Sequence, residues 1–459
     1  MTTNVSTPLR LRPPLPPLRP LLQRLPLRCT ALVTAGLLLV PALLLQQRPR
    51  PRAEGLGRFL PHAALLQSFP ADPLRPAPQL WRQRLPGGLA ERLWRQQRAP
   101  WWQFWGRDGA GGVYLVMPLP RAMAVGSEPL PANSLAIDGL LVVAASPLAQ
   151  RLAADQLRGA PRPQRGLQGR CLDSLQRRQA VYWSADGLGA MAGPLAPLLQ
   201  TLQEGCLELQ LAGAALALDG EVAATAGLLA PAPQALGAAA LPPPLPSELL
   251  LQLRGRRLEP LLRGLLNRQL IREPLVATYG LAEPQLALLR QSPFVLRLRP
   301  LAQGPFQAGL ELLLLPSGER QAWERLLEGL ADRLVERGLE PLPTNPTLWR
   351  DQQQRTVGGW RWLPGPSLKQ PLLQLVLGPA PVGAAAAPSD LARIEAWRRL
   401  PELQLQARPQ ALLTLGLLPS QLPLPLQQAT ELQGVVAADP AAGGAGLSRL
   451  LARLQLAPR

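Results

Sequence analysis

The residues of this chain that could carry out chemistry are few and widely separated. His62 is the only histidine, so multi-histidine metal sites are excluded and any Ser-His or Cys-His arrangement depends on it. Gly187, Gly189 and Gly193 are spaced G-x-G-x-x-x-G, which departs from the dinucleotide-binding fingerprint and is typical of a glycine-rich turn. The sequence therefore predicts no catalytic, metal-binding or cofactor-binding residue, although carboxylates distant in sequence can still meet in one cleft.

Two of the three cysteines form a candidate pair. Cys29 lies in an apolar N-terminal segment, which leaves Cys171 and Cys206 for the rest of the chain. An exported protein favours a disulfide between them, closing a loop worth roughly 3 to 4 kcal/mol in the chain-entropy model. The alternative is two thiols buried separately in the core.

Tryptophan and arginine alternate in a short region after residue 80. A tryptophan ring has an apolar body and a polar edge, and an arginine stem can lie along apolar surface, so both suit a water-lipid boundary. The alternative is that the tryptophans fill a core. The predicted membrane interface consists of Trp94, Trp101, Trp102, Trp105, Arg92, Arg95 and Arg98. If it exists, at least Trp101, Trp102 and Trp105 should be exposed on the face that bears the arginines.

The segment Cys29–Leu45, CTALVTAGLLLVPALLL, contains seventeen uncharged residues between arginine-rich flanks. A helix of this length is at the short end of what crosses a hydrocarbon core of roughly 30 Å. With Gln46 and Gln47 at the interface, we predict one transmembrane anchor over residues 29–47. The alternatives are a cleaved secretory signal, although QQRPRPRAEG after Leu45 lacks the expected small-x-small site, and a buried core helix.

The net charge of +18 is concentrated beside this predicted anchor. Residues 1–107 hold sixteen arginines and three acids, so thirteen of the eighteen net charges lie there. This distribution favours contact with anionic lipid, at about 1 kcal/mol per near-surface charge, and argues against nucleic acid. The alternative is a coding bias, since Lys369 is the only lysine among 48 basic residues. The first basic flank predicts a cytoplasmic N-terminus and a body outside the cytoplasm.

Short strands and amphipathic helices are predicted after residue 112. An Asp138-Gly139 turn precedes LLVVAASPLAQRLAADQL, which reads as a strand followed by a helix starting at Ser146-Pro147. The run CLELQLAGAALALDGEV is typical of a hairpin, and residues 321–337 form the clearest helix, with Gly338 as its C-cap. The predicted fold class is α+β, mainly antiparallel sheets backed by amphipathic helices, with one N-terminal transmembrane helix.

Residues 223–246 carry no charge and contain six prolines, which predicts a stiff, polyproline-like connector between two domains. The predicted organisation is a basic tail over 1–28, the anchor over 29–47, a basic, Trp-rich juxtamembrane segment over 48–107, a first α+β domain over 108–222, the linker over 223–246, and a second α+β domain over 247–459.

Three stretches carry a resemblance to a known family: RFLPHAALLQSFPADPL, DGLLVVAASPLAQRLAADQL and PFQAGLELLLLP. Together with the basic N-terminus and single anchor, they resemble a cyanobacterial family of single-anchor membrane proteins of unknown function. The proline content and the Trp-rich segment depart from that family. The resemblance implies an α+β body outside the cytoplasm with no established activity.

The predicted function is that of a non-enzymatic interaction or assembly factor, anchored in the membrane by a single pass. Its body would lie in the periplasm or thylakoid lumen, with protein partners in the envelope or thylakoid and no cofactor. The alternative is a carrier or sensor of lipid or another apolar ligand, which a deep leucine-lined cavity would favour. An enzyme is the third possibility, which Asp, Glu, Ser or His62 clustered in one cleft would favour.

Overall fold

The computed structural model describes Leu37, Trp397 and residues 52–107, 112–159, 166–187, 202–223, 240–266, 269–301, 306–343, 345–367, 370–379, 400–418, 424–438 and 447–457. The chain divides into two compact units, Met1–Arg52 and Ala53–Arg459, and the elements below belong to the second. The predicted anchor over 29–47 lies outside the described residues except for Leu37. Among the described residues, no helix has the length and apolar character that crossing a membrane requires.

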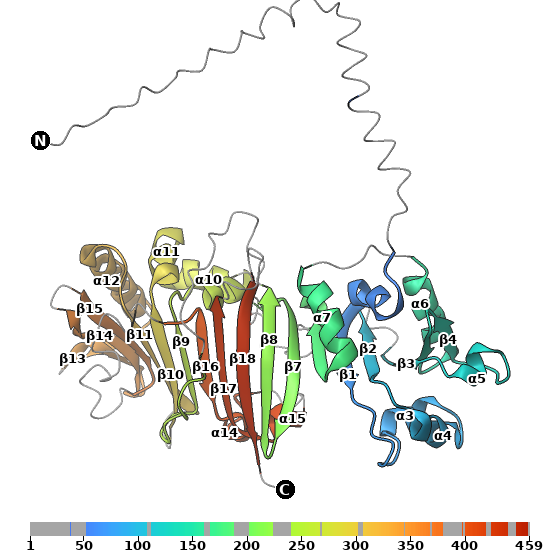
Figure 1. Cartoon of the computed structure of the whole chain (residues 1–459). Coiled ribbons are helices and arrows are strands. Elements are labelled where there is room, and N and C mark those ends of the chain that lie inside the picture. Colours follow the sequence, from blue (N-terminus) through green and yellow to red (C-terminus); the bar gives the residue numbers. More distant parts are fainter. Residues whose placement is uncertain are drawn as a thin grey trace, which may run out of the picture. The chain divides into compact units, whose positions relative to one another are not determined.

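Eighteen strands within the described residues form one sheet (Figure 1). The strands are β1 Ala63–Phe69, β2 Trp101–Gly106, β3 Val113–Pro118, β4 Ser134–Ile137, β5 Leu140–Val143, β6 Ala180–Trp183, β7 Glu204–Ala212, β8 Ala215–Ala223, β9 Leu251–Gly255, β10 Phe294–Pro300, β11 Ala308–Leu314, β12 Glu340–Leu342, β13 Asn345–Arg350, β14 Thr356–Ser367, β15 Gln370–Leu377, β16 Leu403–Ala407, β17 Ala429–Ala438 and β18 Leu447–Leu456.

Every pairing in this sheet is antiparallel. The spatial order is β4-β5-β3-β2-β1-β6-β7-β8-β18-β17-β16-β9-β10-β11-β15-β14-β13-β12. The two edge strands, β4 and β12, are only four and three residues long, and β12 contains Pro341. Short edges and a proline limit pairing with the sheets of other molecules.

The described helices are η1 Gly55–Arg58, η2 Leu60–His62, α3 Gln79–Arg84, α4 Leu89–Gln96, α5 Arg121–Ala124, α6 Pro147–Leu157, α7 Gly166–Arg177, α9 Glu259–Leu266, α10 Gln269–Tyr279, α11 Glu283–Gln291, α12 Arg320–Glu336, α14 Pro409–Thr414 and α15 Leu424–Gln427. Helices therefore accompany a mainly antiparallel sheet, and the predicted α+β class is confirmed at this level.

Local turn and cap chemistry explains the element boundaries around β5. Asp138 and Gly139 both have positive φ, 49° and 77°, which suits the tight hairpin between β4 and β5. After β5, the hydroxyl of Ser146 accepts a hydrogen bond from the N–H of Ala149, and Pro147 occupies the first turn of α6. The predicted turn, strand and helix start are all confirmed.

The strands nearest the N-terminus are covered on both faces. β3 and β5 are buried almost throughout, because one apolar cluster packs α6 and α7 on one side and another packs α3 and α4 on the other. Neighbouring residues of β2 show the alternation, since Trp102 belongs to the first cluster and Trp101 to the second. Strands β3 and β5 have continuous apolar sequences because both of their faces are buried.

The strands from β9 to β15 present a leucine-rich face to helices. Leu253, Leu296 and Leu312 pack with residues of α9, α11 and α12 in one large apolar cluster. Helix α12 matches the predicted helix over 321–337, with Trp323 buried against the sheet. It ends as predicted, because Gly338 has a φ of 77° and donates its N–H to the carbonyl of Val335.

The opposite face of this part of the sheet carries a polar row. Gln433, Gln406, Gln252, Arg297 and Glu311 are directly opposite one another across β17, β16, β9, β10 and β11. Three of them, Gln252, Gln406 and Glu311, are buried. Buried polar groups need partners, and hydrogen bonds run from Arg297 to Gln252 and from Gln252 to Gln406.

The sheet passes without a break across the predicted domain boundary at 223–246. Strand β8 comes before that boundary in sequence, yet it pairs along its whole length with β18, which comes after it. Most of the predicted linker, residues 224–239, lies outside the described residues. The segment predicted to be juxtamembrane, 48–107, supplies β1 and β2 to the same sheet.

Candidate binding cleft

Helix α7 carries two stripes of side chains. Leu167, Cys171 and Leu175 are spaced four apart and buried, so they fix the helix on the sheet. A second set at the same spacing, Arg170, Ser174 and the post-helical Arg178, turns toward the adjacent strands. The helix therefore brings two cations and a hydroxyl over the sheet.

The strands beneath supply three acids on one face. In the β7–β8 hairpin, Glu208 lies directly opposite Asp219 and Cys206 lies opposite Glu221. On the next strand, Arg449 of β18 lies opposite Glu221. Like charges directly opposite one another repel, so Glu208 and Asp219 need cations nearby.

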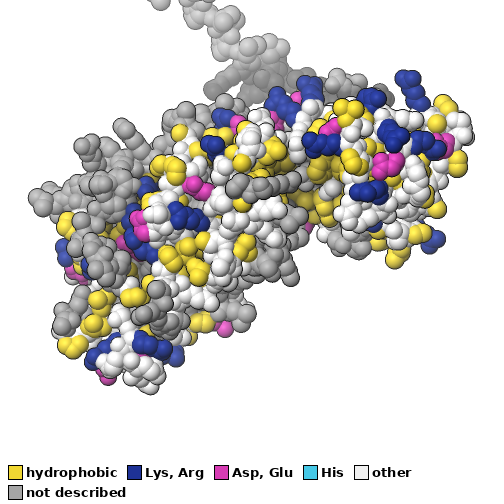
Figure 2. Space-filling model, turned by 90° about the horizontal axis from the view of Figure 1, so that it is seen from below, with side chains coloured by type: hydrophobic (Ala, Val, Ile, Leu, Met, Phe, Trp, Pro, Cys, Tyr) yellow, Lys and Arg dark blue, Asp and Glu magenta, His cyan; other side chains and the backbone are white. Residues whose placement is uncertain are grey.

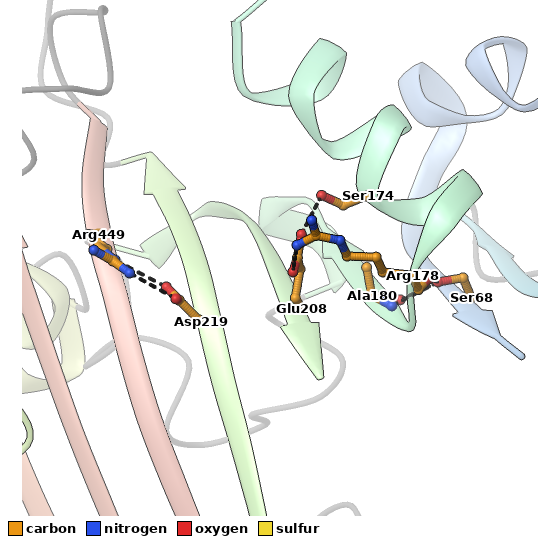
Figure 3. A network of polar contacts seen from close by, with 7 residues as sticks. All are labelled: Ser68, Ser174, Arg178, Ala180, Glu208, Asp219 and Arg449. Atoms are coloured by element: carbon orange, nitrogen blue, oxygen red, sulfur yellow. Dashed lines mark hydrogen bonds and ion pairs between the residues drawn. The ribbon is translucent and has the colours of Figure 1, made fainter. Parts of the chain in front are cut away.

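Three arginines provide that compensation. The guanidinium of Arg170 lies 2.6 Å from the carboxylate of Glu221. Arg449 binds Asp219 through two hydrogen bonds, of 3.1 Å from Nε and 2.8 Å from Nη2. Arg178 pairs with Glu208, as the close-up shows (Figure 3). The three acids and three arginines leave the cleft close to neutral.

Glu208 is the most heavily engaged of the acids. Besides Arg178, it accepts a hydrogen bond of 2.9 Å from the hydroxyl of Ser174. The hydrogen bond and the charge of Glu208 raise the pKa of Arg178 above its ordinary value, so this cation stays fully charged. The Ser174 hydroxyl thus donates to a carboxylate that is already bound by a permanent cation.

Helix α7 and strands β7, β8 and β18 line an open cleft. Its volume of about 360 Å³ is within the range of ligand-binding sites. Its lining includes two of the chain's three cysteines, three acids and three arginines: Leu167, Arg170, Cys171, Ser174, Arg178, Cys206, Glu208, Asp219, Gly220, Glu221 and Arg449. The cysteines are joined by a disulfide with a Cα–Cα separation of 5.6 Å, so α7 is linked covalently to β7 at the cleft. The predicted pair is therefore bonded in this structure.

A buried serine fixes the turn that presents Arg178. The hydroxyl of Ser68 in β1 donates to the carbonyl of Arg178 at 2.6 Å and accepts the N–H of Ala180 at 2.7 Å (Figure 3). Ser68 is completely buried. Because both bonds go to the backbone between α7 and β6, they hold the end of the helix at a fixed place beside β7.

A second polar cluster supports the other end of α7. Tyr182 donates to Glu204 at 2.6 Å, and Gln168 donates to the same carboxylate oxygen at 2.6 Å. Burial, followed by the hydrogen bond to Glu204, raises the pKa of Tyr182 above its ordinary value. The phenol therefore remains protonated and keeps donating to Glu204, which ties β6, β7 and α7 together.

The membrane-interface prediction for the tryptophans is wrong for Trp94, Trp101 and Trp102. Their exposed fractions are 3%, 3% and 5%, while Trp105 is half-buried. Trp94 and Trp101 pack edge to face with Trp81, at centroid distances of 5.0 and 5.8 Å. These large rings contribute buried apolar area to the core, so the alternative, core tryptophans, is confirmed for these three.

The arginines of that prediction are exposed, but they do not form a common surface with the tryptophans. Arg92, Arg95 and Arg98 lie on the solvent side of α4 and just after it. Arg92 forms an ion pair with Glu128, and Arg98 donates to the carbonyl of Arg95. The tryptophans point inward and the arginines outward, as helical and strand periodicity requires.

Neither His62 nor Gly187 is among the residues that line the cleft. Burial and then the charge of Arg107 lower the pKa of His62, which lies beside β1. The glycines at 189 and 193 lie outside the described residues. The described residues hold no group of three or more His, Cys, Asp or Glu placed to bind a metal ion.

Sequence reasoning missed every charged residue of the cleft. A signal was present for α7, because Arg170, Ser174 and Arg178 repeat at four-residue spacing, and for β8, where Asp219 and Glu221 alternate with apolar residues. No local signal connects Arg449 to Asp219, which is 230 positions away. Comparisons with protein-family models, curated proteins and solved structures find no match to this chain.

Proposed function

We propose that this chain is a membrane-anchored, non-enzymatic interaction or assembly factor whose α7 cleft holds a polypeptide segment of a partner protein. The observation that carries the proposal is the set of three arginine–carboxylate pairs lining the cleft. A partner segment with both a basic and an acidic side chain can exchange with these pairs without leaving any charge unpaired.

The balance of charges also supports a protein partner over an anionic one. A nucleic acid or an anionic lipid headgroup would meet three carboxylates as well as three arginines in the cleft, so the near-neutral lining offers it no net attraction. On the face drawn in Figure 2, basic side chains are interleaved with acidic and hydrophobic ones. The charged lining likewise differs from the leucine-lined cavity that a lipid carrier would need.

An enzymatic role has one point in its favour, because carboxylates and a serine do share this cleft. The carboxylate of Glu208 is, however, already paired with Arg178. A serine nucleophile needs a base ready to take its proton, and Glu208 held by an arginine is poorly suited to that. Binding therefore accounts for the arrangement better than catalysis.

Residues 29–47 would anchor the protein, with the body in the periplasm or thylakoid lumen, where an oxidising environment would maintain the Cys171–Cys206 bond. Retention of the protein in membranes after an alkaline carbonate wash supports the anchor. Full release by the wash, or a mature N-terminus beyond Leu45, would contradict it.

A photocrosslinking residue at Ser174 in the full chain, expressed in its own membranes, tests the cleft. We expect a discrete crosslinked neighbour that is lost in Arg449→Glu and recovered in Asp219→Arg/Arg449→Glu, where the ion pair is restored in reverse. A crosslinker at the exposed Arg151 on α6 serves as the matched control. An Arg449→Glu protein that keeps the same neighbour at the same yield would contradict the proposed binding site.

A further inference from the structure

A proline-rich segment of this chain lies on the polar face of the sheet, away from the α7 cleft. The segment Leu241–Pro246, LPPPLP, has prolines at four of six positions, which favour the extended polyproline conformation with three residues per turn. Pro242 and Leu245, three residues apart, are buried, and the prolines beside them are exposed. The buried side chains thus recur at the three-residue spacing that a polyproline conformation would place on one side.

Arg408, directly after β16, binds the C-terminal part of this segment. Its guanidinium donates to the carbonyl oxygens of Leu245 at 3.1 Å, Pro246 at 3.2 Å and Ser247 at 2.7 Å. The planar guanidinium presents several donors in a fixed geometry, so one side chain can bind successive carbonyls of an extended chain.

Two further side chains bind the backbone of the segment. Gln406 donates its amide to the carbonyl of Pro243, and the carboxylate of Glu431 accepts the N–H of Leu245 at 2.8 Å. Because proline lacks an N–H, Leu241 and Leu245 hold the segment's only two backbone donors. The sheet therefore binds backbone carbonyls of the segment and the amide of Leu245, and the segment buries every third side chain.

These binding groups are held in place by the polar row described above. Gln252 donates to the side-chain oxygen of Gln406 at 2.8 Å, and Gln433 donates to Glu431 at 3.1 Å. A hydrogen bond from the neighbouring strand β9 fixes Gln406, and one from within β17 fixes Glu431. Such preorganisation lowers the entropy cost of binding.

We propose that Gln406, Arg408 and Glu431 form a binding site for proline-rich peptides, here occupied by the chain's own Leu241–Pro246. The ligand from outside is a Pro-Pro-Leu-Pro segment of another protein, which replaces the internal segment and makes the same contacts with the site. Recognition of backbone carbonyls and of every third side chain is how extended proline-rich segments are bound in general, because they are already ordered before binding. The internal segment acts as a competitor that must leave first.

Fluorescence anisotropy of the full chain in detergent tests this, with a labelled peptide of residues 240–248 as the probe. Leu245→Asp puts a carboxylate in place of a buried apolar side chain and should release the internal segment. If that segment occupies the site for more than nine-tenths of the time, its release should tighten probe binding by about tenfold or more. Leu245→Asp/Arg408→Ala should lose that gain, and Leu74→Asp, at a side chain 97% exposed, should behave as the unmodified chain.

Circular dichroism establishes that each variant is folded. If Leu245→Asp unfolds, Pro242→Gly/Pro244→Gly, which removes the stiffness of the internal segment and keeps Leu245, takes its place with the same expectation. Folded variants that bind the probe no more tightly than the unmodified chain would overturn the proposal. Tight binding that survives Arg408→Ala would do so as well.

Discussion

The strands around β3 and those around β9 bury their surfaces in different ways. Helices cover β3 and β5 on both sides, and these strands are apolar throughout. In β9, β10 and β16, leucines face the helices, while Gln252, Arg297 and Gln406 form the polar row on the other face. The first region is stabilised by packing, whereas the second also depends on hydrogen bonds within its buried face, so substitutions should affect the two differently.

The largest loss of stability is expected from Trp81→Ala in the apolar region. Trp81 is fully buried among aromatic rings, and removing so large a side chain should cost about 4 kcal/mol in the free energy of unfolding. Urea denaturation measures this. Trp81→Phe should cost much less, since the buried indole N–H has no hydrogen-bond partner among the described residues. Equal losses for both variants would contradict a core held by packing.

The disulfide at the cleft should come next. Replacing Cys171 and Cys206 by alanine opens a loop spanning 35 positions, which the chain-entropy model values at roughly 3 to 4 kcal/mol. The unmodified chain should migrate faster on a non-reducing gel than after reduction, and its urea midpoint should fall in the presence of a reducing agent. Cys29→Ser is the control and should leave both unchanged. Free thiols at 171 and 206 in protein isolated from its own membranes would refute the pairing.

A smaller effect is expected from Glu311→Gln in the polar row. The carboxylate is buried within 3.8 Å of Arg297 and 3.7 Å of Arg299, so a neutral amide leaves two cations without their acid. We expect a loss of about 2 kcal/mol. A matched pair nearer the surface, tested by Glu340→Gln beside the half-buried Arg350, should change stability by less than about 1 kcal/mol. If the two variants lose equal amounts of unfolding free energy, burial does not make the ion pairs of the polar row more important than a pair nearer the surface.

The smallest expected effect is the pH dependence contributed by His62. Burial, then Arg107, lowers the pKa of His62 from 6.5 in the folded chain. Between that lowered pKa and 6.5, the unfolded chain binds more protons, so stability should decline as the pH falls through this window. Urea midpoints at pH 7.5 and pH 5 measure it, and His62→Gln should make the decline shallower. An unchanged slope in that variant would assign the pH dependence to other groups.

Much of the local structure followed from the sequence because it depends on neighbouring residues. The Asp138-Gly139 turn, the Ser146 cap and the end of α12 at Gly338 each involve groups within a few positions of one another. Their geometry is set by backbone dihedrals and short-range hydrogen bonds, which residue type largely dictates. The same holds for the apolar stripe of α12.

The positions of the tryptophans could not be predicted from the local sequence. Their spacing suited both a lipid surface and a core, because a ring that is apolar on one side satisfies either environment. Only the packing of α3 and α4 on one face of β2, and of α7 on the other, decided for the core. The cleft likewise depended on pairing between β8 and β18, which joins Asp219 to Arg449 across 230 positions. Composition and periodicity determined the elements and their buried faces. The order of the strands depends on how the whole chain buries its apolar surface, and that order decided which charged side chains meet.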